Sequence, residues 1–404
     1  MGGVKRGAAM GTVIDYIKKY GHYSFRELPM TEVDSLALCQ LSYLKFEGMV
    51  PQLGENKPAV SLASLKKHPD YEKLFADVRF EESNRALIES MLSRRRYRNL
   101  KMNFYINLVA KQRETQFSAI TFVLDDGTVY VAFRGTDETI VGWKEDFNMA
   151  FLYPVPSQEY SVSYLNRVAT SFHGPLYVGG HSKGGNLAVY AAAFAPVYAQ
   201  SRIEQVYNYD GPGFADTVLL APGYRHICQR VSTYVPQSSV VGMLLGHKEQ
   251  HTIVHSDQVG IKQHDIYSWE IRRDTFVYLQ SVTNSSRLVD YTLKAFVAAL
   301  TPEQREQFID AVYAVLSETN ASTIREMKKN WAVSAGRALR SMKNLDEPTR
   351  KAVMHALKVL GSSTRSGLTR VIAERPQKEK RTGYTVRVGR IKTLPSGLYP
   401  RGRK

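Results

Sequence analysis

One serine in this sequence is placed to do chemistry. It is Ser182, in the segment GHSKG at residues 180–184. This segment fits the pattern G-x-S-x-G, in which the serine stands on a sharp turn between a strand and a helix and acts as a nucleophile. The backbone N–H of Lys183 would start that helix, where an unpaired donor and the helix dipole both favour an oxyanion. Together these groups would serve acyl transfer. The alternative is a glycine-rich turn in which Ser182 only caps the helix.

The segments on both sides of this motif have the composition that a strand–turn–helix unit needs. Tyr177 and Val178, which precede the motif, are strand-forming residues. Residues 187–192, which follow it, are rich in alanine and favour a helix packed on a sheet. This context supports the interpretation of Ser182 as a nucleophile.

Strand and helix patterns alternate between residues 116 and 275, which predicts an α/β fold with a mostly parallel central sheet flanked by helices. Ligands of such sheets bind beyond the carboxyl ends of the strands, and Thr136, Ser182 and Asp210 all follow strand-like runs there. The strand-like runs outside the motif are residues 117–124, 129–133, 203–209 and 231–235, and the first two form a predicted hairpin around Asp125-Asp126-Gly127.

The pattern divides the chain into four regions. We expect an N-terminal helical region at residues 1–115 packed on the core, an α/β core at 116–275, a C-terminal helical extension at 276–360, and a basic, flexible tail at 361–404. Within the first region, Thr31 is the expected N-cap of a helix with Asp34 in its first turn. The arginine-rich residues 94–98 are expected to form a solvated face.

Two segments, VAFRGT at residues 131–136 and GHSKGG at 180–185, resemble the class 3 (fungal-type) lipase group of α/β hydrolases. The chain looks more closely like a bacterial branch of lipase-like proteins. The resemblance spans roughly residues 12 to 300 and implies an α/β-hydrolase-type fold. It also implies that Ser182 is the nucleophile, His264 the base and Thr136 the second oxyanion donor. Further shared patterns are Ser24-Phe25, Pro29, Glu32-Val33-Asp34, Asp210-Gly211-Pro212-Gly213-Phe214, Gln263-His264-Asp265 and Trp269.

The acid of the expected triad is less well defined. Lipases of this group usually carry it after the next strand but one, where this chain has PQSSV at residues 236–240 and no carboxylate. We favour Asp210 because it ends a strand at the same edge as Ser182, although Asp before Gly-Pro-Gly is also ordinary turn chemistry. The alternative acid is Asp257, which is nearer to His264 in sequence. The order Ser…Asp/Glu…His also admits Asp216, Glu204 and Glu249.

The histidines are candidate metal ligands and candidate bases. His247, His251 and His255 recur every four residues, yet a zincin needs Glu directly after the first His, and Lys248 stands there. We therefore expect no metal and no cofactor. By chain order His264 is the expected base, and a histidine of a surface loop is the competing interpretation.

Composition describes a globular chain. Its 404 residues, 43% of them hydrophobic with a mean hydropathy of -0.30, are enough for a sizeable core. Cys39 and Cys228 have no C-x-x-C spacing, so we expect no disulfide or zinc site and a reducing, cytoplasmic location. No secretion signal is recognised, and no apolar run approaches the ~20 residues of a membrane span.

The net charge of +16 is concentrated at the end of the chain, because residues 365–404 contain twelve Lys or Arg and two Glu. Such a tail could make weak contacts with an anionic polymer or a membrane surface. The alternative is a solvated, disordered end.

Two functions follow from these observations. The first is a serine esterase or lipase-like hydrolase acting on small-molecule or lipid esters of short to medium acyl chains. Residues 149–156, MAFLYPVP, would then form a lid or acyl-pocket wall, although apolar runs are more often plain core. The second is a catalytically inactive binding or scaffolding protein of the same fold, with the tail for anionic partners. The missing carboxylate at residues 236–240 motivates this alternative.

Overall fold

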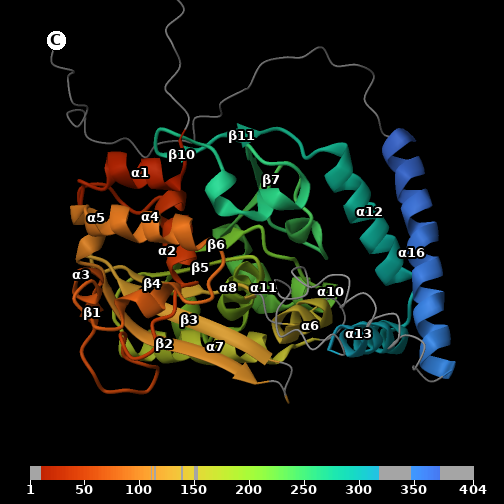
Figure 1. Ribbon diagram of the computed structural model, residues 1–404, viewed down its shortest axis with the longest axis horizontal. Coiled ribbons are helices and arrows are strands. Elements are labelled where there is room, and N and C mark those ends of the chain that lie inside the picture. Colours follow the sequence, from red (N-terminus) through yellow and green to blue (C-terminus); the bar gives the residue numbers. More distant parts are fainter. Residues whose placement is uncertain are drawn as a thin grey trace, which may run out of the picture.

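The computed structural model describes residues 11–110, 112, 115–137, 140–149, 153–317 and 347–373. Within these residues a nine-stranded sheet runs through the centre of the molecule in the order β1-β2-β3-β4-β5-β6-β7-β8-β11 (Figure 1). The strands of this sheet are β1 (Val60–Ser61), β2 (Lys101–Ala110), β3 (Thr115–Val123), β4 (Val129–Phe133), β5 (Leu176–His181), β6 (Ile203–Tyr209), β7 (Val231–Pro236), β8 (His251–Val254) and β11 (Tyr278–Leu279). Strands β9 (Ile271–Arg272) and β10 (Thr275–Phe276) pair separately.

The middle of the sheet is parallel and its two sides are antiparallel. Strands β4 to β8 pair in parallel, whereas β1 to β4 pair antiparallel, as do β8 and β11. Parallel neighbours need long crossover connections. Helices α6 (Ile140–Asn148) and α7 (Pro156–Ser171) connect β4 to β5, and α8 (Lys183–Phe194) connects β5 to β6. The predicted α/β class and the parallel centre of the sheet are therefore confirmed.

Helices cover both faces of the sheet, and the alternation along β4 shows how. Tyr130 and Ala132 belong to a core shared with α1 (Val13–Tyr20), α2 (Glu32–Leu41) and α4 (Glu81–Leu92). Val131 and Phe133 belong to a second core shared with α7, α8 and α11 (Pro222–Ile227). Since successive side chains of a strand point to opposite faces, β4 is apolar on both sides and lies in the interior.

The other helices are α3 (Leu62–Leu65), α5 (Arg95–Arg98), α9 (Val197–Gln200), α10 (Asp216–Leu219), α12 (Asn284–Ala298), α13 (Pro302–Ser317) and α16 (Glu347–Ala373). Short 3-10 turns occur at η1 (Tyr71–Phe75), η3 (Cys228–Arg230), η4 (Val241–Met243), η5 (Gly260–His264) and η6 (Ile266–Ser268). Phe296, Leu300 and Ala356 form a third, small core between α12 and α16, which lie side by side at the right of Figure 1. No helix of the described residues is long and apolar enough to cross a membrane.

The start of α2 is held by a buried ion pair. Thr31 caps the helix as predicted: its hydroxyl accepts the N–H of Asp34, and the carboxylate of Asp34 accepts the N–H of Thr31 at 2.9 Å. Asp34 also pairs with Arg96 at 2.6 Å, with both side chains 0% exposed, and accepts the hydroxyl of Tyr97 at 2.5 Å. The prediction of a solvated face at residues 94–98 is therefore wrong for Arg96, because Asp34 supplies a partner that sequence spacing does not reveal.

Two predicted boundaries differ from the structure. Residues 101–110 form β2, so the sheet begins inside the region 1–115 that was expected to be helical. Helix α16 continues through Gly361, where we expected the tail to begin, as far as Ala373. It packs on α12, and Val371 is buried. This packing outweighs the cost of about 1 kcal/mol of a glycine inside a helix. Residues 374–404, the rest of the expected basic tail, lie outside the described residues.

Candidate active site

Ser182 stands in a strained turn at the carboxyl end of β5, directly before α8. Its backbone dihedrals, φ 60° and ψ -134°, are rare for a residue with a side chain. The turn is tight because glycines flank it: a Cβ atom on Gly180 would lie 2.1 Å from the carbonyl of Gly184, and one on Gly184 would lie 2.1 Å from the oxygen of Phe133. The serine side chain is partly exposed. The local structure is thus the strand–turn–helix unit that the sequence predicts.

Two groups that the sequence proposes as oxyanion donors lie next to this turn. Lys183 is the first residue of α8, and the first N–H groups of a helix have no acceptor within it. The loop that carries Thr136 passes close by, since a Cβ atom on Gly135 would lie 3.0 Å from the Cβ atom of Ser182. The Thr136 hydroxyl donates to Asp146 of α6 at 2.5 Å, which holds this loop against the helix.

The side chain of Lys183 joins the serine turn to the same helix, a role that sequence reasoning missed. Its ammonium group is buried and lies 3.0 Å from the Oε2 atom of Glu145 and 3.8 Å from the Oδ1 atom of Asp146. Burial raises the pKa of Asp146 to about 6, although the charge of Lys183 and the hydroxyl of Thr136 act in the opposite direction. In the sequence, the two adjacent carboxylates Glu145 and Asp146 are the feature that could have indicated a cationic partner.

Asp210 and His264 are in direct contact. Asp210 follows β6, the neighbour of β5, and its N–H donates to the oxygen of Tyr234 at 2.8 Å. Its Oδ2 atom lies 2.6 Å from Nδ1 of His264. The Oδ1 atom accepts the hydroxyl of Ser239 at 2.5 Å and the N–H of Gly242 at 3.1 Å. Because this 1% exposed carboxylate is held from both sides, it can fix the orientation of the imidazole.

The structure does not bring the other candidate carboxylates to His264. The side chain of Asp257 is exposed, and its Oδ1 atom accepts from the amide of Gln258 at 3.3 Å. Asp216 and Glu204 are also exposed. Glu249 is buried but contacts His247. Of the carboxylates that the chain order allows, Asp210 is the one in contact with His264 among the described residues.

His181, the residue before Ser182, links the serine turn to the loop of His264. Its Nε2 atom donates to the backbone oxygen of His264 at 2.9 Å, and its Nδ1 atom lies 3.0 Å from the hydroxyl of Tyr43. The two imidazole rings are 4.5 Å apart. Burial lowers the pKa of His181 well below its usual value, so the ring is neutral and donates from Nε2 only. No role was predicted for His181 from the sequence.

Ser182 and His264 are connected through His181 and not through a direct hydrogen bond. Among the contacts of the described residues, no hydrogen bond joins the hydroxyl of Ser182 to the imidazole of His264. Such contacts are often long in enzymes without substrate and shorten in the reacting complex. Gln263 fixes the approach of the loop, since its side-chain oxygen accepts the N–H of Ser238 at 2.6 Å and its backbone oxygen accepts the indole N–H of Trp269.

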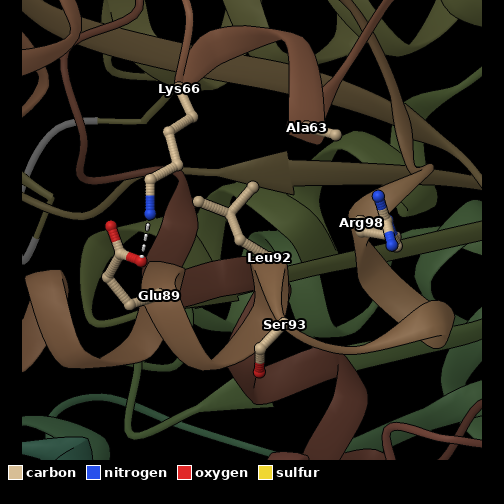
Figure 2. A pocket seen from close by; sticks show the side chains of 6 residues that line it. All are labelled: Ala63, Lys66, Glu89, Leu92, Ser93 and Arg98. Atoms are coloured by element: carbon tan, nitrogen blue, oxygen red, sulfur yellow. Dashed lines mark hydrogen bonds and ion pairs between the residues drawn. The ribbon is translucent and has the colours of Figure 1, made fainter.

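Two surface hollows lie among residues other than those of this cluster. Figure 2 shows the first, which is crossed by an ion pair of 2.8 Å between Lys66 and Glu89. It is lined by Ala63, Lys66, Glu89, Leu92, Ser93 and Arg98. The second hollow is lined by Gly54, Glu55, Asn56, Lys57, Asn103, Phe104, Arg167, Ser171 and Phe172. Neither includes a candidate catalytic residue, so we assign no substrate to them.

The fold and this cluster define an α/β protein that gathers a serine, a histidine and an aspartate at the carboxyl edge of its sheet. The chain belongs to the family described as Mbeg1-like, which matches residues 91–314. No curated protein matches the sequence.

Similar solved structures include three lipases. M37 lipase has a TM-score of 0.35 and 14% identity, covering 54% of this chain and 70% of that one. A fungal lipase–inhibitor complex has a TM-score of 0.30 and 18% identity, covering 43% and 70%. A deletion mutant of Rhizomucor miehei lipase with its propeptide has a TM-score of 0.30 and 15% identity, covering 59% and 85%.

Proposed function

We propose that this protein is a serine hydrolase of the α/β-hydrolase type that cleaves carboxylic esters through an acyl-enzyme. The observation that carries the proposal is the 2.6 Å contact between Asp210 and His264. Asp210 ends the strand beside the one that leads to Ser182, whose turn has the strained geometry of a nucleophile. A serine, a histidine and a carboxylate in these places have the roles of a catalytic triad.

In the proposed reaction, His264 donates its Nδ1–H to Asp210, which leaves the Nε2 lone pair free to accept the proton of Ser182. The serine oxygen attacks the ester carbonyl, and the N–H groups of Thr136 and Lys183 stabilise the oxyanion. His264 then gives its proton to the leaving alcohol. Water, activated by the same imidazole, attacks the acyl-enzyme and releases the acid.

The loop after β7 supports this assignment of the acid. Lipases of the resembling group usually carry their acid there, and this chain has Ser239, which donates a hydrogen bond to Asp210. Asp210, which lies one strand earlier, therefore accepts a hydrogen bond from the loop in which those lipases usually carry the acid. The inactive alternative was motivated by the absence of a carboxylate at residues 236–240. In the proposed site Asp210 takes the role of that carboxylate.

A covalent probe tests the proposal. A fluorophosphonate should label the full-length protein, Ser182→Ala should abolish the labelling, and Ser238→Ala should retain it. Ser238 is a suitable control because its hydroxyl contacts Thr283 and no proposed catalytic residue. A protein that is folded by circular dichroism yet takes up no probe would favour the binding or scaffolding alternative.

The proposed substrates are small-molecule or lipid esters with short to medium acyl chains. A series of p-nitrophenyl esters from acetate to palmitate measures this preference. A maximum at palmitate together with activation at an emulsion surface would contradict it. Residues 150–152, at the centre of the expected lid or pocket wall, lie outside the described residues, so their role in this preference stays a prediction.

A further inference from the structure

A second cluster of titratable side chains lies at the start of β8. His247 and Glu249 are in the segment before the strand, and His251 is its first residue. Each offers one possible ligand atom, and these three atoms all lie within 4.8 Å of one another. The rings of His247 and His251 are 4.4 Å apart and nearly perpendicular. The proposed esterase mechanism uses none of these residues.

Two nitrogen atoms in this cluster have no partner. The Nε2 atoms of His247 and His251 are both buried and make no hydrogen bond within the part of the chain that the structure describes. The side chain of His247 is only 4% exposed. Leaving a buried polar atom unsatisfied costs about 1–3 kcal/mol, so two such atoms on neighbouring rings suit a site that binds a partner.

Glu249 supplies negative charge and fixes one of the two rings. Its carboxylate accepts the hydroxyl of Thr233 at 2.7 Å, the hydroxyl of Tyr224, and Nδ1 of His247 at 2.8 Å. Burial alone would raise the pKa of Glu249, but the hydrogen bonds from His247, Tyr224 and Thr233 hold it below its usual value. The contact between this carboxylate and Nδ1 of His247 holds a proton between two possible ligand atoms, and a metal ion can replace that proton.

We propose that His247, Glu249 and His251 bind a divalent transition-metal ion, for which Zn²⁺ is the best fit. Two imidazoles and one carboxylate are a known set of zinc ligands, whereas Mg²⁺ and Ca²⁺ prefer oxygen atoms alone. Bonds of about 2.0–2.2 Å in a tetrahedral site place ligand atoms roughly 3.3 Å apart. The three ligand atoms lie within 4.8 Å of one another, so binding requires the side chains to move inward and the ion to replace the hydrogen bond between Glu249 and His247.

The ionisation of His251 is compatible with this role. Burial, followed by the neighbouring His247, lowers the pKa of His251 to about 4. The ring is then neutral at physiological pH, and only a neutral imidazole binds a metal. The nearby cation Lys294 also contributes to this shift, and it is paired with Asp290 at 2.8 Å.

The sequence prediction of no metal site relied on the H-E-x-x-H pattern, which presupposes a helix. Here the histidines come from an irregular segment and a strand, and the carboxylate is Glu249, two residues after the first histidine. His255 is not part of the cluster, since it pairs with Glu270 at 3.0 Å. The H-E-x-x-H spacing identifies zinc sites on helices, so it does not apply to a cluster formed by an irregular segment and a strand.

The ion would stabilise the segment that follows the proposed acid. Phe214 and Gly246 exchange two backbone hydrogen bonds, of 2.7 and 3.0 Å, which place the segment before His247 next to the one that follows Asp210. A metal at His247 would fasten this pair of segments to the start of β8. We therefore expect the ion to raise stability.

Metal binding is tested on the full-length protein after dialysis against EDTA. Titration with Zn²⁺ should give about one ion per chain by mass spectrometry and a melting temperature that rises with Zn²⁺ concentration, and Mg²⁺ should do neither. His251→Gln and Glu249→Gln should lose both effects, and His255→Gln should keep them. Co²⁺ should give the absorption bands of a tetrahedral ion in the wild-type protein, which does not depend on whether the variants fold.

The inference is refuted if the wild-type protein retains less than a tenth of an ion per chain. It is equally refuted if folded His251→Gln binds as much zinc as His255→Gln. These outcomes are separate from those of the esterase proposal, because Ser182→Ala should bind zinc normally and the fluorophosphonate reports on Ser182 alone.

Discussion

Replacement of Asp210 by asparagine tests the proposed triad most directly, because the structure defines how the new amide must lie. The Oδ1 atom of Asp210 accepts hydrogen bonds from Ser239 and Gly242. The carbonyl oxygen of the asparagine should keep these two donors, which turns its NH₂ group toward His264. An NH₂ group can only donate, so Nδ1 of His264 must accept and the proton of the ring moves to Nε2. That is the atom that has to accept the proton of Ser182.

The wrong tautomer of the histidine costs on the order of 10⁴ in kcat in enzymes of this type. This corresponds to about 5 kcal/mol of transition-state stabilisation. We expect Asp210→Asn to fold normally by circular dichroism and to lose at least about a thousandfold in kcat toward a p-nitrophenyl ester. Asp257→Asn is the control, since that exposed carboxylate contacts the side chain of Gln258 and, within the described residues, is not bonded to His264, and it should change kcat by less than about tenfold.

A loss below tenfold in Asp210→Asn would show that the residue only shapes its turn, because asparagine also forms such turns. A larger effect of Asp257→Asn would move the acid to that residue. Small effects in both variants would leave a Ser-His dyad and contradict our reasoning about the tautomer.

Three further predictions concern stability. Because the folded-state pKa of Asp146 is raised to about 6, the folded protein holds a proton that the unfolded chain releases, and this residue lowers stability as the pH rises from about 4 to 6. The urea midpoint of Asp146→Asn should therefore rise relative to that of the wild type over this range, and a constant difference would contradict the pKa. Arg96→Met should cost about 3–5 kcal/mol in urea unfolding, because Asp34 is left buried without its partner, and the double variant Arg96→Met/Asp34→Leu should recover most of it. Truncation after residue 373 should leave the melting temperature unchanged, whereas truncation after residue 361 should lower it, because the packing of α16 on α12 is lost.

The sequence predicted those parts of the site that depend on neighbouring residues. The turn at Ser182 follows from its glycines and from the strand and helix patterns beside it. The choice of Asp210 followed from the rule that the carboxyl ends of parallel strands share one edge, and β5 and β6 are indeed parallel neighbours. The assignment of catalytic roles stays a proposal.

Contacts between distant residues could not be read in this way. An arginine among four other basic or polar residues resembles a solvated face. Arg96 is buried because it pairs with Asp34, 62 residues earlier, and donates to the backbone oxygens of Ser24, Leu28 and Pro29. Likewise, the support of Asp210 by Ser239 depends on how the loop after β7 folds back. Residues 101–110 were not recognised as a strand, because the pairing of β2 with β3, with its irregularity between Asn103 and Ile106, is set by the sheet and not by local alternation.

The order of the strands has a consequence for the synthesis of this protein. Each strand from β2 to β8 pairs with the one that precedes it in the chain, so each of them finds its partner already made as it leaves the ribosome. The sheet can thus grow along one edge without waiting for distant segments. The cluster at its carboxyl edge is completed late, because His264 follows Asp210 by 54 residues. Under the proposed mechanism, a nascent chain would expose Ser182 in its turn before His264 is made, and it would gain activity toward esters only when His264 reaches Asp210.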